Sequence, residues 1–183
     1  RRQRQMCIRD RYKMLYNRRE LKDVSKMTDK DYTPGGMTAL LDAVGRTIHK
    51  MDMVSGIHRK DKGNKVLFVI ITDGEENDSR EYTYADVKKL IKDRQENAGW
   101  EFIFLGANID AVAAAENLGI DRDRAVKYKN TGSGVRANFK AVAELSDSLA
   151  KSGRVSDEWK ETVEKDEDDA ADKQSAAVTL HRR

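Results

Sequence analysis

The feature that most constrains the fold is a short, strongly apolar segment followed at once by polar residues. Val66–Ile71 contains six apolar residues without a break, and Thr72, Asp73 and Gly74 come directly after it. A run this short and this apolar is typical of a strand buried on both faces inside a parallel sheet. Open α/β sheets bind their ligands outside the carboxyl ends of the strands. The sequence therefore predicts that the Asp73 carboxylate lies in a binding crevice.

Helical and strand patterns alternate along the chain. The pattern predicts helices over residues 38–53, 83–97, 110–118 and 132–150, and strands over residues 65–71, 100–105 and 125–128. Strands that alternate with helices indicate a parallel sheet wrapped by helices. The predicted fold class is therefore α/β, with a doubly wound, mostly parallel sheet that has helices on both faces.

The two ends of the chain differ in composition from the middle. Residues 1–11 show no helix or strand period, and we expect them to be a spurious or disordered leader. Residues 12–150 form the predicted domain, and residues 151–165 form a short helical extension. We expect residues 166–183 to be a disordered acidic tail, because few apolar residues remain there to offset the entropy of ordering.

Composition argues against several classes of partner. The formal net charge is +3, and residues 1–11 alone carry five arginines and one aspartate, so the remainder has a net charge of −1. We therefore expect no nucleic-acid partner. No apolar run approaches the roughly 20 residues of a membrane span, so we expect no membrane partner and a cytoplasmic location. Cys7 is the only cysteine, which excludes an intrachain disulfide and a cysteine-based zinc site.

Two polar loops are predicted to meet at the carboxyl edge of the sheet. One contains Gly36 and Thr38 at the start of a predicted helix, and the other contains Asp73 and Gly74. A threonine hydroxyl and an aspartate carboxylate are hard oxygen ligands that suit Mg²⁺ or Mn²⁺. Two simpler roles remain open for these residues. Thr38 could be a helix N-cap, and Asp73 could close the turn after its strand through backbone hydrogen bonds.

These two loops, in this order, resemble the von Willebrand factor type A (VWA) family. The resemblance rests on Gly35–Ala43, which reads Gly-Gly-Met-Thr-Ala-Leu-Leu-Asp-Ala, and on Phe68–Gly74, which reads Phe-Val-Ile-Ile-Thr-Asp-Gly. It extends to about residue 150 and is strongest to the small bacterial and phage-type proteins of the family. The resemblance implies a doubly wound α/β fold with a metal-ion-dependent adhesion site built from three loops. Thr38 matches the threonine of the second loop, and Asp73 matches the aspartate of the third.

The first loop of the family's site, Asp-x-Ser-x-Ser at the end of the first strand, has no match in this sequence. The resemblance therefore implies an N-terminally truncated domain that lacks its first strand and helix. For the intact domain it implies Mg²⁺, or Mn²⁺ or Ca²⁺, bound by Thr38 and Asp73 together with the missing serines. Gly36, Gly74 and Asn108 would line the ligand-binding crevice, and Glu75 would contact the partner at its rim or remain a solvated loop residue.

The resemblance implies a binding module and not an enzyme. An open coordination position on the metal would accept an acidic side chain of a protein partner and so produce metal-dependent adhesion or assembly. One alternative is a VWA-like scaffold with a degenerate metal site that serves protein–protein packing. Another is a Mg²⁺-dependent α/β hydrolase. The sequence speaks against a hydrolase, because it has no Gly-x-x-x-x-Gly-Lys-Ser/Thr phosphate loop and no Ser–His–Asp set or second carboxylate beside Asp73.

Overall fold

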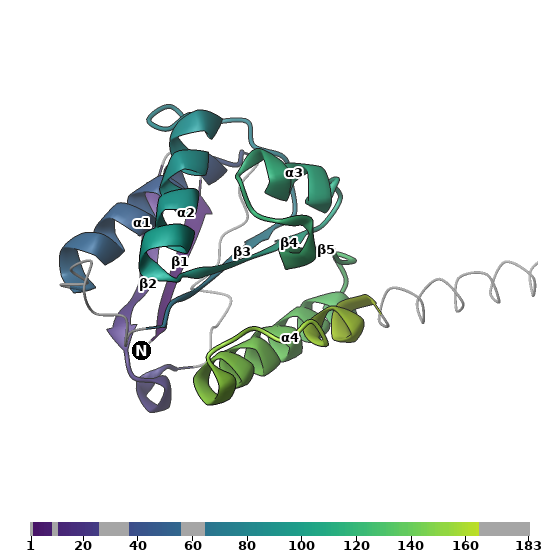
Figure 1. Ribbon diagram of the computed structural model, residues 1–183. Helices are drawn as coiled ribbons and strands as arrows, with labels where there is room; N and C mark the ends of the chain where they lie inside the picture. The colour runs from purple at the N-terminus through teal and green to yellow at the C-terminus, as the bar shows by residue number, and fades with distance from the viewer. Residues whose placement is uncertain (1, 9–10, 26–36, 56–64, 165–183) are drawn as a thin grey trace, which may run out of the picture. The chain divides into compact units, whose positions relative to one another are not determined.

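The chain is a mixed α/β protein with a three-stranded parallel sheet (Figure 1). The computed structural model describes residues 2–8, 11–25, 37–55 and 65–164. The chain divides into two compact units. Unit 1 comprises Arg1–Gly56 and Glu75–Leu90, and unit 2 comprises Ile57–Gly74 and Ile91–Arg183.

Unit 2 contains the parallel sheet that the sequence predicts. Its strands are β3 (Leu67–Thr72), β4 (Glu101–Gly106) and β5 (Ala125–Lys127), in the order β3-β4-β5. Thr72 pairs with Gly106 in the β3–β4 ladder, and Gly106 pairs with Lys127 in the β4–β5 ladder. The prediction of parallel strands is confirmed, and each predicted strand differs from the observed one by at most two residues at either end.

The most deeply buried strand is β4 and not β3. Residues 102–106 of β4 are all buried, whereas Ile71 of β3 keeps 44% of its surface exposed. Among the described strands, β4 lies between two neighbours and β3 has one. The expectation that residues 66–71 are buried on both faces is therefore wrong for part of β3. Apolar side chains favour burial, but the place of a strand in the sheet decides how well it is covered.

Two helices of unit 2, α3 (Ala111–Asn117) and α4 (Gly132–Ser152), lie on opposite sides of this sheet in Figure 1. Each begins at a residue whose side chain accepts a backbone hydrogen bond, as N-caps do. The Asp110 carboxylate accepts from the N–H of Ala113 (3.0 Å), and the Thr131 hydroxyl accepts from the N–H of Gly134 (3.1 Å). A 3₁₀ turn over Arg122–Arg124 leads into β5.

The core of unit 2 extends beyond α4. It contains Ile103 and Leu105 of β4, residues from the inner face of α4, and Val155, Trp159 and Val163 from the segment that follows α4. Residues 159–164 are helical, as the sequence predicts. The segment therefore packs as a part of unit 2, while the predicted tail over residues 166–183 lies outside the described residues.

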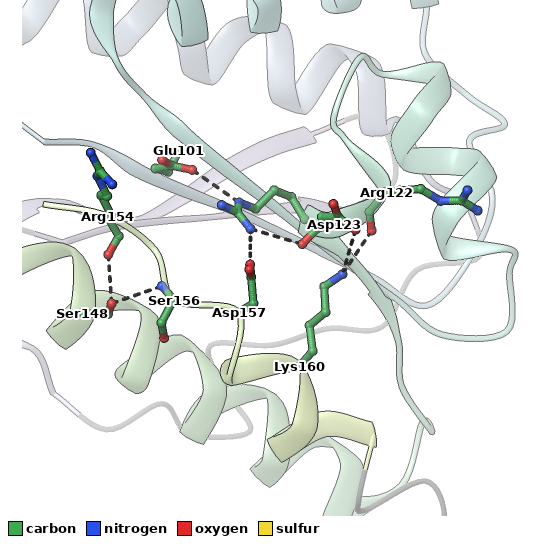
Figure 2. Close-up of polar contacts among 9 residues, drawn as sticks. Glu101, Arg122, Asp123, Ser148, Arg154, Ser156, Asp157 and Lys160 are labelled. Atoms are coloured by element: carbon green, nitrogen blue, oxygen red, sulfur yellow. Dashed lines mark hydrogen bonds and ion pairs between the residues drawn. The ribbon is translucent and has the colours of Figure 1, made fainter. Parts of the chain in front are cut away.

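Ion pairs also join this segment to the start of β5 (Figure 2). Arg124 donates from Nη1 to the Asp157 carboxylate (2.7 Å) and lies 3.6 Å from the Glu101 carboxylate, and Lys160 Nζ lies 3.8 Å from Asp123. Asp157 and Asp123 are largely exposed, and an exposed ion pair contributes no more than about 1 kcal/mol. Burial of an aromatic side chain such as Trp159 contributes more to the free energy of unfolding than these ion pairs do. Packing is therefore the main interaction that holds the segment after α4 on unit 2.

Unit 1 contains a β-hairpin and a helix. Strands β1 (Arg2–Ile8) and β2 (Arg11–Arg19) pair antiparallel, and the 3₁₀ turn η1 covers Leu21–Asp23. The expectation of no regular structure in residues 1–11 is therefore wrong for β1. Antiparallel pairing satisfies backbone groups through the ladder, and this does not require a regular side-chain pattern.

Helix α1 (Leu40–Ser55) buries Leu41, Val44 and Ile48, which helical spacing places on one face. Helix α2 (Tyr84–Ala98) begins in unit 1 and ends in unit 2. A capping box opens it, since the N–H of Thr83 donates to the Asp86 carboxylate (2.9 Å) and the N–H of Asp86 donates to the Thr83 hydroxyl (3.3 Å). Within the described ranges, no helix is long and apolar enough to cross a membrane.

A substitution of Trp159 tests the role of the segment after α4. Because Trp159 is 1% exposed, we expect Trp159→Ala to lower the free energy of unfolding by about 3–5 kcal/mol. The matched control is Glu158→Ala at the exposed neighbouring position, which should change it by less than about 0.5 kcal/mol. Urea unfolding followed by circular dichroism measures both. Equal midpoints for the two variants would show that the segment does not contribute to the core.

Candidate functional site

Thr38 lies in unit 1, two residues before α1, in a loop whose backbone is held by a side chain. The N–H of Thr38 donates to Oδ1 of Asn77 (2.8 Å), and the N–H of Asn77 donates to the carbonyl of Thr38 (3.0 Å). The Thr38 hydroxyl has no hydrogen-bond partner within the described part of the chain. These two hydrogen bonds hold the backbone of Thr38 in place. The hydroxyl oxygen of Thr38 remains available to a ligand.

Other residues cap the first turn of α1. The N–H of Leu41 donates to the Glu76 carboxylate (2.9 Å), and the N–H of Asp42 donates to the Ser79 hydroxyl (3.1 Å). These are the donors that a helix N-cap normally satisfies. The N-cap role considered for Thr38 is therefore filled by Glu76 and Ser79, which belong to a distant part of the sequence.

We call residues 75–82 the clasp, because their polar groups form hydrogen bonds with residues at the start of α1. The Glu76 carboxylate accepts from the N–H groups of Asp78 (3.0 Å) and Ser79 (2.7 Å) and from the Ser79 hydroxyl (2.8 Å), in addition to Leu41. The structural role of Glu76 was not predicted from the sequence. No motif marks it, because a capping box places the serine or threonine three positions before the acidic residue, whereas here Glu76 precedes Ser79.

Asp42 is the second carboxylate that holds the clasp. It is 8% exposed and accepts from the N–H groups of Arg80 (3.0 Å), Glu81 (2.9 Å) and Tyr82 (3.0 Å). Burial alone would raise the pKa of Asp42, but hydrogen bonds from the three N–H groups stabilise the ionised form, and the pKa lies below its ordinary value of 3.8. The clasp is therefore built around a buried negative charge.

Three further contacts fix the clasp on α1. Arg46 Nε donates to the Glu81 carboxylate (2.7 Å), and this hydrogen bond lowers the pKa of Glu81. The ring of Tyr82 covers Gly45 so closely that a Cβ there would lie 2.5 Å from the ring. The ring of His49 lies 5.9 Å from the same tyrosine, centroid to centroid. Glycine at position 45 is thus required by the approach of Tyr82.

Asp73 lies in unit 2, directly after β3, and its carboxylate has no partner among the residues that the structure describes. The turn at this point is closed by its neighbour, since the Thr72 hydroxyl donates to the carbonyl of Gly74 (2.9 Å) and accepts weakly from the N–H of Gly74 (3.4 Å). The turn-closing role considered for Asp73 therefore belongs to Thr72. The exposed Asp73 carboxylate remains available to a ligand.

Asn108 meets Asp73 at the carboxyl ends of β3 and β4. Its side-chain amide donates to the Asp73 carbonyl (3.4 Å), and its backbone has a positive φ of 58°, which asparagine tolerates better than most residues. Of the other predicted site residues, Gly74 lies in the same turn, Glu75 is exposed at the start of the clasp, and Gly36 lies outside the described residues. Thr38 belongs to unit 1 and Asp73 belongs to unit 2.

The available donors are hard oxygen atoms. Across the described ranges, no three histidine, cysteine, aspartate or glutamate side chains are grouped so as to hold a metal ion. The predicted ligand set is of another kind, because it combines one hydroxyl, from Thr38, with one carboxylate, from Asp73. Such donors fit Mg²⁺, which takes one or two carboxylates and keeps several waters.

Comparison with known proteins found no match to a family model, to a curated protein or to a solved structure. A function is therefore inferred from the resemblance of the two loops and from the geometry of their side chains.

The buried charge of Asp42 should make the stability of unit 1 depend on pH. A carboxyl group with a depressed pKa stabilises the folded state above its unfolded pKa, and this contribution is lost as the pH falls through the folded value. We expect Asp42→Asn to lower the free energy of unfolding by about 1–3 kcal/mol at neutral pH, because buried N–H donors lose a charged acceptor. The difference from the unsubstituted chain should shrink below about pH 4.

Thermal melts of the two proteins between pH 7 and pH 3 measure this difference. Asp147→Asn is the matched control, since Asp147 is exposed on α4 and makes no hydrogen bond or ion pair with the residues described. A difference between Asp42→Asn and the unsubstituted chain that does not change with pH would contradict the account of a stabilising buried charge.

Proposed function

We propose that this chain is part of a metal-ion-dependent protein-binding module with the doubly wound α/β fold of the VWA family. The mixed α/β architecture and the parallel order β3-β4-β5 support that fold class. The proposal concerns binding and not catalysis, and the resemblance of the Thr38 and Asp73 loops supports the family assignment.

One observation carries the proposal. The two side chains that match the family's metal ligands are both without protein partners among the described residues, although the backbone around each is held by hydrogen bonds. Polar side chains with a structural role normally satisfy the groups around them. Here Glu76 and Ser79 cap α1 in place of Thr38, and Thr72 closes the turn in place of Asp73. Both side-chain oxygens are therefore accessible to a ligand, which supports the proposal.

The chemistry of the two donors suits a small divalent cation. In the proposed site, the Thr38 hydroxyl and the Asp73 carboxylate bind Mg²⁺, or Mn²⁺ or Ca²⁺, which would also carry water molecules. A bound ion of this kind provides an electrophilic position that an aspartate or glutamate of a protein partner can occupy. Gly36, Gly74, Glu75 and Asn108 are the proposed contacts around that position. Hydrogen-bonded loops support such a site, because Mg²⁺ demands nearly ideal octahedral geometry.

Mn²⁺ binding tests the two ligands directly. We expect Thr38→Ala and Asp73→Asn each to weaken Mn²⁺ binding by roughly tenfold or more, because even outer-shell partners of metal sites contribute factors of 10–100. Thr38→Ser keeps the hydroxyl and should retain most of the affinity. Asp147→Asn removes an exposed carboxylate elsewhere and should have no effect. Electron paramagnetic resonance of free Mn²⁺ gives the dissociation constants of the unsubstituted chain and of the four variants.

Two results would overturn the proposal. Equal Mn²⁺ affinity in all four variants would contradict metal binding at Thr38 and Asp73 and would favour a VWA-like scaffold used for protein packing. Mg²⁺-dependent hydrolysis of p-nitrophenyl phosphate by the chain, abolished in Asp73→Asn, would instead favour an α/β hydrolase.

A further inference from the structure

Strand β3 uses only one of its two edges for pairing within the described part of the chain. The carbonyl of Val66 accepts from the N–H of Glu101 (2.9 Å). The carbonyl of Thr72 accepts from the N–H of Ala107 (2.9 Å). Because backbone groups of successive strand residues point to opposite edges, every second residue from Val66 to Thr72 bonds to β4. The residues between them direct their N–H and C=O groups to the other edge; these are Leu67, Val69 and Ile71.

No residue that the structure describes occupies this second edge, which we call the free edge of β3. Of the described strands, β4 alone pairs with β3, and Leu67, Val69 and Ile71 make no other hydrogen bond with the described residues. An unpaired row of N–H and C=O groups can pair with a further strand. The side chain of Ile71 is also 44% exposed. The free edge therefore offers both hydrogen bonds and apolar surface to a partner.

The sequence of β3 is typical of an inner strand. Edge strands are commonly short or are protected by lysine, proline or a bulge. The strand at the opposite side of this sheet, β5, fits that description, because it has three residues and ends at Lys127. Strand β3 has six residues, Leu-Phe-Val-Ile-Ile-Thr, with no charge and no proline, and its register with β4 contains no bulge. A further strand is therefore expected beside β3.

We infer that the free edge of β3 pairs with the same edge of a second copy of this chain. The two strands run antiparallel about a two-fold axis at Val69, which joins the two three-stranded sheets into one continuous sheet. In this register Leu67 lies opposite Ile71 of the copy, and Val69 lies opposite its own equivalent. Opposed residues of this kind exchange two hydrogen bonds, so every backbone group on the free edge is used. The inference does not rest on the proposed metal site.

Charge favours a second copy over an unrelated strand. No like charges meet between the two strands, because β3 has no charged residue. Lys65 precedes β3 and Asp73 follows it, and both are exposed. The antiparallel register places Lys65 of each copy opposite Asp73 of the other, and opposite charges that face each other across two strands stabilise the pair. Ile71 meets the apolar Leu67 of the copy, which removes its exposed side chain from water.

Sedimentation velocity of the full chain in EDTA, which keeps metal ions away from Asp73, measures the assembly. We expect a species of about twice the chain mass of 20.8 kDa, in equilibrium with the monomer. Ile71→Lys should raise the dissociation constant of this dimer roughly tenfold or more, because a lysine on an edge strand opposes pairing. Val135→Lys places the same charge on α4 at a residue that is 37% exposed, and this matched control should leave the constant unchanged.

Cross-linking tests the register. In a Cys7→Ser background, Val69→Cys should form a disulfide with its equivalent under oxidation, because opposed hydrogen-bonded residues have Cα atoms about 5.5 Å apart. Ile71→Cys in the same background should remain monomeric on a non-reducing gel. Its equivalent in the copy lies four positions further along the strand, about 13 Å away, which is beyond the reach of a disulfide.

Several results would overturn the inference. A chain that sediments as a monomer at all concentrations, or a dimer that Ile71→Lys does not weaken, would exclude pairing at the free edge. Larger aggregates without a dimer, or cross-linking of Ile71→Cys in place of Val69→Cys, would exclude the two-fold arrangement at Val69. Failure of the metal proposal is a separate result, because a dimer that forms in EDTA supports this inference whether or not Mn²⁺ binds at Asp73.

Discussion

Unit 1 depends on two carboxylates that satisfy backbone N–H groups. Asp42 accepts three successive N–H groups of the clasp, and Glu76 accepts N–H groups of both the clasp and α1. A buried donor that lacks an acceptor costs about 1–3 kcal/mol, so these bonds decide the path of the chain around the start of α1. One consequence is that Asn77 meets the backbone of Thr38. The position of Thr38 is thus set by residues that are far from it in the sequence.

The parallel sheet has the corresponding role in unit 2. Parallel strands bring their carboxyl ends to one edge, and here that edge carries Asp73, Asn108 and Lys127. Each of these residues ends or follows a different strand. The hydrogen bonds of the turns and helices that come next do not use the Asp73 carboxylate or the Lys127 ammonium. At this edge the Asp73 carboxylate has no partner among the described residues, which supports the proposed metal site.

Local signals in the sequence predicted much of the fold. The helices predicted over residues 83–97, 110–118 and 132–150 are observed as α2, α3 and α4, and each begins with a capping hydrogen bond between residues three positions apart. Burial was predicted less well. Ile71 is as apolar as the residues of β4, yet it stays 44% exposed because β3 has one neighbour among the described strands. The pairing of β1 with β2 was missed because residues 1–11 have no side-chain period.

Between residues 38 and 150, the sequence by itself determined the element types, the parallel class of the sheet and the two loops that resemble the VWA site, because these depend on local periodicity and short motifs. Only the tertiary structure showed that Glu76 and Ser79 cap α1 and that Thr72 closes the turn before Gly74, so that the side chains of Thr38 and Asp73 are left without partners. The bonds from Glu76 and Ser79 to the start of α1 join residues more than thirty positions apart. The folded backbone brings such distant hydrogen-bond partners together, and the spacing of residues along the sequence does not reveal them.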